Sequence, residues 1–177
     1  MTANAKLTPY IKAAEIQTRI KELAKEIDAY YAGKEIIAIF LLNGAIFFGV
    51  DLVRQMKTPM KIDTLSASSY SGTESTGVIK INSDLKINIT GKHALIVEDI
   101  VDTGLTLKSI VNFVGQKKPA DLKIVCLLDK YERRVVDNLT VDYTGFKIED
   151  NFVVGYGFDY NENFRTLDQI YIYGGEG

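Results

Sequence analysis

The 177-residue sequence is poor in the side chains that usually carry covalent and transition-metal chemistry. It has one His, one Cys and no Trp. A single Cys cannot form an intrachain disulfide, and one His with one Cys cannot complete a structural zinc site. A catalytic triad would have to run through His93 alone. We therefore expect any bound metal to be a hard cation held by carboxylates and ligand oxygens, which points to magnesium or manganese.

The sequence also lacks a membrane segment, a signal peptide and an excess of charge of either sign. Its most apolar stretch, residues 36–50, is shorter than the roughly 20 residues of a spanning helix, and Asn43-Gly44 interrupts it. No apolar run follows the N-terminus, so we expect a cytoplasmic protein without a membrane partner. Lys and Arg total 21 against 23 Asp and Glu, a net charge of −2. This balance argues against a broad nucleic-acid-binding surface.

What the sequence does contain is an alternation of apolar runs and amphipathic segments. Apolar residues recur at helical spacing over 14–31, and Gly33 ends this helix. Compact apolar runs predict strands at 36–42, 61–68, 78–81, 93–97 and 122–128. Two further helices are predicted between them, at 45–56 and 105–114. This alternation predicts an α/β fold with a mainly parallel twisted sheet covered by helices on both faces.

The length fits one domain with a core of its own, and no repeat or linker divides it. We expect a single domain over residues 1–177. Its core would span about 34–142, and a small hood lobe would come from about 1–15 and 143–177. The tail from Tyr143 is rich in Gly and aromatic residues and should form short strands and loops.

The strongest motif is LIVEDIVDTGLTL, residues 95–107. Its apolar strand delivers Glu98 and Asp99 to the carboxyl end, where open α/β sheets bind ligands. The small residues that follow open a helix. Its free N–H groups and the Thr103 and Thr106 hydroxyls suit a phosphate, at ~0.3–1 kcal/mol for each dipole contact. The acidic pair suits sugar hydroxyls or a neighbouring magnesium ion. The alternative is a capped helix with solvated acids.

This motif resembles the phosphoribosyl-diphosphate-binding sequence of the type I phosphoribosyltransferases. Four further segments narrow the resemblance to the hypoxanthine and hypoxanthine-guanine phosphoribosyltransferases: LLNGAIFFGVDL, SSYSGTESTGVIKI, the Lys130 of CLLDK, and FVVGYGFDYNENFR. Together they cover most of the chain, from about Ile36 to Ile172. The resemblance implies the type I fold, with the hood formed by the terminal segments, and a homodimer or homotetramer.

The resemblance also implies a reaction in purine salvage. With Mg²⁺, the 5-phosphoribosyl group of phosphoribosyl diphosphate would be transferred to N9 of a 6-oxopurine, hypoxanthine or guanine. The products would be IMP or GMP and pyrophosphate. Asp102 would accept the purine N7 proton as general base, and Glu98 and Asp99 would hold the ribose hydroxyls, directly or beside the metal. The 5′-phosphate would be bound by Asp102, Thr103, Gly104, Leu105 and Thr106.

Three other positions match purine-binding residues of the family. Lys130 would donate to the 6-oxygen, and a charge-assisted bond of this kind is worth ~1.5–3 kcal/mol. An ammonium cannot accept a hydrogen bond from the amino group of adenine, so Lys130 would also discriminate against that base. Phe152 would stack on the purine, and the Val153 backbone would contact its edge. Without the resemblance, Lys130 would be a surface lysine and Phe152 a core aromatic.

A second set of positions matches residues that contact the pyrophosphate and the metal in the family. Arg165 would pair with its oxygens bidentately, and Asp159 would join Glu98 and Asp99 as a carboxylate near the metal. Asn43 and Gly44 would form the pyrophosphate loop. The family commonly places Lys or Arg immediately before this Gly, so Asn43 is a departure that removes a charge.

The segment from Ser69 to Gly77 is small and polar, which predicts a mobile loop. The resemblance makes it a lid in which Ser69 and Tyr70 approach the pyrophosphate and exclude water from the reacting ribose. We expect structural roles for His93 and Cys126, which lie on apolar strands.

Two other functions stay open from the sequence. One is a regulator that uses the same fold to sense phosphoribosyl diphosphate and binds nucleic acid, but the chain has neither a basic face nor an added DNA-binding module. The other is a sister transferase for xanthine, orotate, uracil or adenine. Lys130 together with Phe152 favours a 6-oxopurine but does not exclude xanthine.

Overall fold

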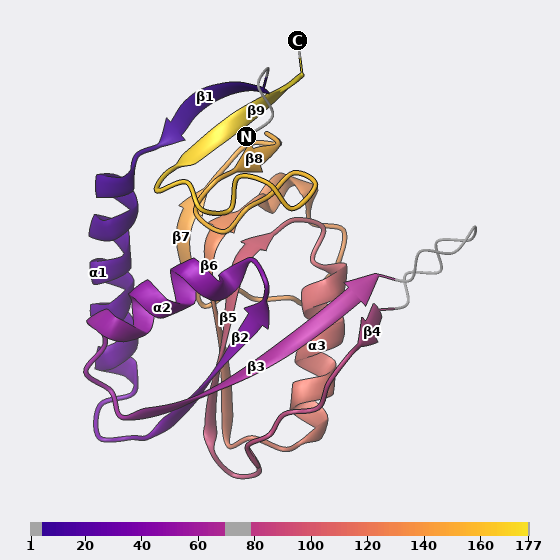
Figure 1. The fold of residues 1–177 in the computed structure, drawn as a ribbon. Helices are drawn as coiled ribbons and strands as arrows, with labels where there is room; N and C mark the ends of the chain where they lie inside the picture. Colours follow the sequence, from indigo (N-terminus) through magenta and orange to yellow (C-terminus); the bar gives the residue numbers. More distant parts are fainter. Residues whose placement is uncertain (1–4, 70–78, 177) are drawn as a thin grey trace.

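The structure, a computed structural model, describes residues 5–69 and 79–176. Its centre is a six-stranded sheet in the order β4-β3-β2-β5-β6-β7 (Figure 1). The strands are β2 (Ile36–Leu42), β3 (Met60–Ser69), β4 (Ile79–Ile81), β5 (His93–Val101), β6 (Asp121–Asp129) and β7 (Tyr143–Lys147). Strands β3, β2, β5, β6 and β7 run parallel, and β4 pairs antiparallel with β3 at the edge. The predicted α/β fold with a mainly parallel sheet is confirmed.

Both faces of this sheet are covered, because successive residues of a strand point to opposite sides. Every second residue of β2 from Ile36 packs into one apolar cluster, which also contains α1 (Ala13–Tyr30) and α2 (Ala45–Gln55). The residues between them, from Ile37 to Leu41, pack into a second cluster that contains α3 (Leu105–Gln116). Figure 1 shows α3 on the side opposite α1 and α2. None of the helices in the described ranges combines the length and apolarity needed to cross a membrane.

A second, three-stranded sheet contains both terminal segments. It is antiparallel, in the order β1-β9-β8, and consists of β1 (Ala5–Ile11), β8 (Val153–Val154) and β9 (Ile170–Glu176). Figure 1 shows it beyond the carboxyl ends of the parallel strands. The Tyr156 hydroxyl, just after β8, donates to Asp51 Oδ2 of α2 at 2.6 Å, and Gln17 Nε2 of α1 donates to the same oxygen at 2.6 Å. These bonds tie the small lobe to the helices beside the sheet.

The predicted helices and strands occur within a few residues of their expected bounds, with three differences. Residues 143–147, expected in the hood lobe, instead form β7 at the edge of the central sheet. Strand β5 continues past the predicted end at residue 97 to Val101, because Ile100 and Val101 still pair with Leu128 and Asp129 of β6. Glu98 and Asp99 therefore lie inside the strand rather than after it. Strand β1 was not predicted, since its pairing partner β9 lies at the other end of the chain.

Candidate active site

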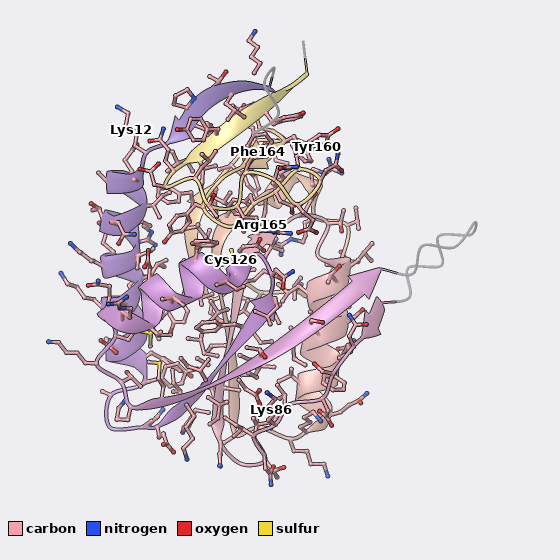
Figure 2. All side chains as sticks on the ribbon, in the orientation of Figure 1. Lys12, Lys86, Cys126, Tyr160, Phe164 and Arg165 are labelled. Atoms are coloured by element: carbon pink, nitrogen blue, oxygen red, sulfur yellow. The ribbon has the colours of Figure 1, made fainter. Side chains whose placement is uncertain are left out.

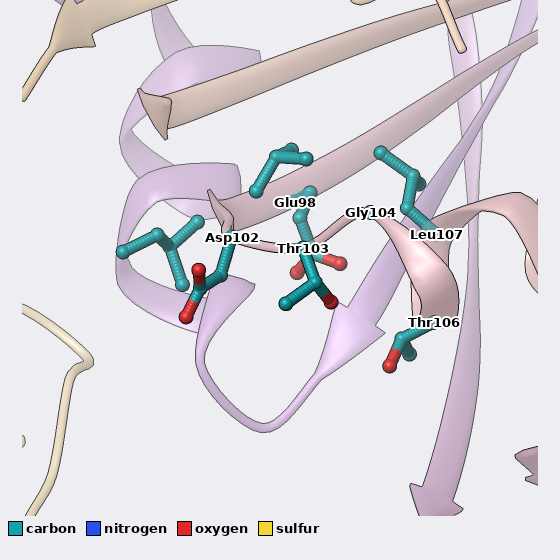
Figure 3. Close-up of a pocket in the computed structure, with 8 residues that line it drawn as sticks. Glu98, Asp102, Thr103, Gly104, Thr106 and Leu107 are labelled. Carbon is teal, nitrogen blue, oxygen red and sulfur yellow. The ribbon is translucent and has the colours of Figure 1, made fainter. Parts of the chain in front are cut away.

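The turn between β5 and α3 forms a small cavity at the carboxyl edge of the sheet (Figure 3). Its volume is about 100 Å³. It is lined by residues of the predicted phosphate-binding motif and their neighbours, Glu98, Ile100, Val101, Asp102, Thr103, Gly104, Thr106 and Leu107. Both predicted hydroxyl residues, Thr103 and Thr106, thus line the cavity, and helix α3 begins between them. A phosphate-sized anion would meet two hydroxyls and the N–H groups of a helix start, which have no carbonyl partner within the helix.

The tight turn into α3 depends on Gly104. Its φ angle is +83°, a left-handed conformation that side-chain-bearing residues rarely adopt. A Cβ at this position would also lie 2.5 Å from Val136 and 2.8 Å from Arg134. The loop after Lys130 therefore packs directly behind the turn, and only glycine fits there.

The two acidic residues of the motif line two different cavities. Glu98 lines the small cavity, whereas Asp99 lines a second, larger one. Desolvation raises the pKa of Glu98 well above its ordinary value, and the negative charge of Asp99 raises it further. Desolvation also raises the pKa of Asp99. The Asp99 N–H donates to Glu98 Oε1 at 3.0 Å, which holds the pair together.

This acidic pair is the part of the site that fits a magnesium ion. Desolvation raises the pKa of both adjacent carboxylates, and the positive charge of Arg165 offsets only part of this rise, at Asp99. A bound cation would favour their charged forms. Within residues 5–69 and 79–176, no group of three or more His, Cys, Asp or Glu side chains is arranged to hold a metal. Magnesium characteristically uses one or two protein carboxylates and completes its shell with water and substrate phosphate oxygens. Glu98 and Asp99 match that pattern.

The second cavity, of about 260 Å³, brings together most of the residues predicted to contact the purine and the pyrophosphate. Its lining comes from the end of β5, the end of β6 and the small lobe: Asp99, Ile100, Asp102, Lys130, Phe152, Val153, Phe158, Asp159 and Arg165. The Phe152 side chain is 52% exposed, so its ring is accessible to a ligand. Tyr160 and Tyr173 pack edge-on against it, with ring centroids 5.9 Å away.

Lys130 lines this cavity, and its side chain is 9% exposed. Its ammonium is 3.2 Å from Asp150 Oδ1. Arg133 approaches the same carboxylate, with Nη1 2.9 Å from Oδ1 and 2.8 Å from Oδ2. The Nε atom of Arg133 lies 2.9 Å from Oδ1 of Asp102. Asp150 and Arg133 were not predicted, and no local pattern singles them out in the sequence.

Asp159 comes from the long connection between β8 and β9, and so does Arg165, which is labelled in Figure 2. They form an ion pair, with Arg165 Nη2 2.9 Å from Asp159 Oδ1. Arg165 Nη1 also donates to the Gly157 carbonyl at 2.7 Å, and Nη2 lies 3.2 Å from Glu162. The guanidinium is thus held at the cavity wall by its own loop.

The predicted pyrophosphate loop follows β2. Asn43 is exposed, and the Leu42–Asn43 peptide is cis. Gly44 lies against the Asp99 carboxylate, so closely that a Cβ at residue 44 would overlap it. Asn43 and Gly44 do not line the 260 Å³ cavity, but the contact with Asp99 places their loop beside it. Ser69 is the last residue of β3, and Tyr70 lies outside the described residues.

Neither His93 nor Cys126 is placed to act as a nucleophile or a base in the site. His93 begins β5, at the end of the strand opposite the motif, and its ring lies 5.9 Å from the ring of Tyr31. Cys126 is buried in β6 (Figure 2), and desolvation raises the pKa of its thiol. A thiol held in its protonated form is a poor nucleophile.

Comparison with known proteins assigns the family. Residues 11–161 match the family model of the phosphoribosyl transferase domain. The hypoxanthine-guanine-xanthine phosphoribosyltransferase of Tritrichomonas foetus is 44% identical over 88% of this chain and 85% of its own. The hypoxanthine phosphoribosyltransferase of Salmonella typhimurium is 44% identical over 90% and 91%.

A solved structure agrees with these relatives. The crystal structure of a hypoxanthine-guanine phosphoribosyltransferase from Bacillus anthracis is 43% identical, with a TM-score of 0.90, and covers 97% of this chain and 99% of that one. The similarity extends over the sheet, the small lobe and both cavities, since nearly the whole chain is covered. The chain therefore belongs to the phosphoribosyl transferase domain family and, within it, to the hypoxanthine-guanine phosphoribosyltransferases.

Proposed function

We propose that the chain transfers the 5-phosphoribosyl group of phosphoribosyl diphosphate to N9 of a 6-oxopurine, hypoxanthine or guanine, and releases pyrophosphate. One observation carries this proposal. A cavity of about 260 Å³ is lined at once by a buried ammonium, an accessible aromatic ring and a carboxylate, those of Lys130, Phe152 and Asp102. These groups suit the 6-oxygen, the ring face and the N7 proton of such a base.

In this proposal Lys130 and Asp102 meet the purine edge that carries the 6-oxygen and N7, and Phe152 meets the ring face. Lys130 donates to the 6-oxygen, Phe152 stacks on the ring and the Val153 backbone contacts the edge. As N9 forms its bond to C1′ of the ribose, the bond from C1′ to the pyrophosphate oxygen breaks. The N7 proton passes to Asp102 in the same step, which keeps the purine from accumulating positive charge.

The ribose phosphate occupies the smaller cavity. Its 5′-phosphate accepts hydrogen bonds from Thr103, Thr106 and the backbone between them, in the cavity of about 100 Å³. Gly104 and Leu105 contribute backbone only, which is why the turn can approach the ligand closely. Glu98 and Asp99 accept from the ribose hydroxyls.

The leaving group is stabilised by positive charge. A magnesium ion held by Glu98 and Asp99 supplies part of that charge when bound. Arg165 adds a guanidinium, once the incoming phosphate oxygens replace some of its present contacts with Asp159 and Glu162. The loop of Asn43 and Gly44 would complete the pyrophosphate site, and Asp159, which lines the same cavity as Asp99, would lie near the metal. We keep the lid role of Ser69 and Tyr70 as a prediction.

The assembly and location of the protein are also proposals. Three apolar side chains of α2 are exposed, Ile46 at 41%, Phe47 at 37% and Val50 at 40%. A cluster of exposed apolar residues on one helix is typical of an interface. We propose that this cluster is the interface of a homodimer or of part of a homotetramer.

A single domain with a hood is supported by the small sheet, which joins β1 to β8 and β9. A cytoplasmic location stays a prediction.

A steady-state assay tests the proposed function. Phosphoribosyl diphosphate and magnesium are combined with hypoxanthine, guanine, xanthine or adenine, and nucleotide formation is followed. We expect turnover with hypoxanthine, guanine or both, and none with adenine, because Lys130 offers only donors. Two relatives of equal identity differ in whether their names include xanthine, so overall similarity does not rank the bases. Absence of turnover with all three oxopurines would overturn the proposal.

A further inference from the structure

An ion-pair network connects the two side chains that are proposed to act on neighbouring atoms of one purine edge, the 6-oxygen and N7. Lys130 contacts Asp150 at 3.2 Å, Arg133 Nη1 donates to both oxygens of Asp150 at 2.9 and 2.8 Å, and Arg133 Nε lies 2.9 Å from Asp102 Oδ1. The four side chains alternate in sign. The network therefore runs continuously from the ammonium for the 6-oxygen to the carboxylate for the N7 proton.

The backbone fixes the spacing within this network. A short 3-10 turn, η1 (Tyr131–Arg133), begins directly after Lys130, and the Arg133 N–H donates to the Lys130 carbonyl at 2.9 Å. Asp150 lies two residues before Phe152, in the segment that leads into β8. One turn therefore carries both cations, and one carboxylate from the purine-stacking segment bridges them.

Exposure shows what this network contributes. The side chains of Arg133 and Asp150 are 44% and 54% exposed, and ion pairs so open to water contribute little to folding stability. They nevertheless affect protonation: Arg133 and Lys130 hold the pKa of Asp150 below its ordinary value. The consequence of the Arg133 contact is therefore more a matter of orientation than of stability.

The geometry at Asp102 is selective for one of its two oxygens. Arg133 Nε forms an ion pair with Oδ1 at 2.9 Å, and this buried oxygen accepts no hydrogen bond within the described residues, although the side chain as a whole is 41% exposed. We infer that Arg133 is a positioning residue: its charge holds Oδ1 of Asp102 and leaves Oδ2 for the N7 proton of the purine. This inference rests on the proposed function, because Arg133 acts only through the carboxylate that accepts the proton.

Arg133 and Asp150 should then affect different kinetic constants. Arg133 touches Asp102 but does not line the cavity, so its removal should lower kcat and leave the KM of the purine nearly unchanged. Asp150 also holds Lys130, so its removal should lower kcat and raise the purine KM together. A merely structural role would give no such difference between the two constants.

The first experiment compares Arg133→Gln with the wild type in steady-state kinetics and thermal unfolding. We expect kcat to fall about ten-fold, the purine KM to change less than about two-fold and Tm to stay close to the wild type. Arg133→Lys, which keeps the charge, should recover part of the loss. Lys147→Gln is the matched control: Lys147 is an exposed cation whose ammonium lies 5.5 Å from the Tyr131 ring of the same turn, and its removal should change nothing.

A double-mutant cycle then tests whether Arg133 acts through Asp102. In the Asp102→Asn background, Arg133→Gln should have no further effect on kcat, because the group that it orients is no longer a base. An equal fall in both backgrounds, or an unchanged kcat in Arg133→Gln while Asp102→Asn is impaired, would overturn the inference and leave the proposed function standing. If Arg133→Gln unfolds, Asp150→Asn tests the network instead, because Asp150 holds Arg133 as well as Lys130: a kcat equal to that of the wild type would contradict the inference. Failure of the proposed function is recognised separately, by a wild-type protein inactive on every oxopurine.

Discussion

The carboxylate of Asp99 lies directly against the backbone of Gly44. A Cβ on residue 44 would overlap Oδ2 and come within 3.1 Å of Oδ1. This contact joins the loop after β2 to the strand that carries the acidic pair, across the boundary between two neighbouring strands of the sheet. The position of Asp99 therefore depends on the absence of a side chain at residue 44.

Gly44→Ala should displace Asp99 and damage both stability and turnover. Overpacking at a closely packed site typically costs ~1–3 kcal/mol, and we expect a loss of stability in this range together with a fall in kcat of about ten-fold. Chemical denaturation and steady-state kinetics measure the two effects. Gly115→Ala, in α3, is the control, since no atom lies within 4 Å of its Cβ, and it should be neutral or stabilising by up to ~1 kcal/mol. Wild-type stability and turnover in Gly44→Ala would show that this contact does not position Asp99.

Lys130→Ala should weaken binding of the purine more than binding of the cosubstrate. The buried ammonium is the group proposed to donate to the 6-oxygen, and a charge-assisted hydrogen bond of ~1.5–3 kcal/mol corresponds to a rise in the purine KM of roughly ten- to hundred-fold. The KM of phosphoribosyl diphosphate should change little. Initial rates with each substrate varied in turn measure both constants, and Lys147→Ala serves as the surface-lysine control. An equal rise in both constants would argue that Lys130 supports the structure rather than recognising the base.

The local sequence was sufficient to predict the parts of the fold that depend on local pattern. The apolar run of β2 predicted its bounds at Ile36 and Leu42, because a doubly buried strand needs apolar residues on both faces and ends where polar residues begin. The end of β5 was predicted too early, since Glu98 and Asp99 interrupt the apolar run while backbone pairing with β6 continues to Val101. Backbone hydrogen bonds do not depend on side-chain polarity, so pattern alone underestimates such a strand.

The site likewise has one part that the local sequence predicts and one part that it does not. The phosphate-binding turn was predictable, because Thr103, Gly104 and Thr106 are neighbours in sequence and meet one small cavity. The contacts of Arg133 with Asp102 and Asp150 were not predictable, since they depend on how the loop of Arg133 meets two other segments that are distant in the sequence. Neither the types of these residues nor their spacing in the sequence predicts these contacts. They follow from packing of the small lobe against the carboxyl ends of the strands.

Asn43→Lys should strengthen binding of pyrophosphate. Asn43 is exposed on the loop next to Asp99, and a lysine there adds a positive charge beside the proposed path of the leaving group. We expect the inhibition constant of pyrophosphate to fall several-fold at low salt, and less at high salt, because exposed charges are screened. Product-inhibition kinetics at two ionic strengths measure this, with Asn43→Gln as the uncharged control. An inhibition constant equal to that of the control would make charge at this position unimportant.

Glu98→Gln should stabilise the ligand-free protein at neutral pH. Desolvation and the charge of Asp99 raise the pKa of Glu98 well above its ordinary value of 4.5. The folded state therefore holds this proton more tightly than the unfolded state. The stability that this gives is complete below the pKa of Glu98 in the unfolded chain, and it is lost as the pH rises through the pKa in the folded protein. Glutamine does not titrate and avoids this loss. The Tm of the variant should match the wild type near about pH 4.5 and exceed it increasingly toward about pH 8.

Magnesium should have the opposite effect on Tm: it should stabilise the wild type more than Glu98→Gln. A cation that binds Glu98 only in the folded protein stabilises that state by mass action. Magnesium should therefore raise the Tm of the wild type at pH 8, where Glu98 gives up its proton more readily, and raise that of Glu98→Gln less. Glu149→Gln, a change at an exposed glutamate beyond β7, is the control and should follow the wild type in both measurements. Parallel Tm profiles of wild type and Glu98→Gln across this pH range would contradict the elevated pKa. Equal shifts of Tm with magnesium would instead place the cation away from Glu98. The pH profile thus tests the raised pKa of Glu98, and the magnesium titration tests separately whether Glu98 binds the cation.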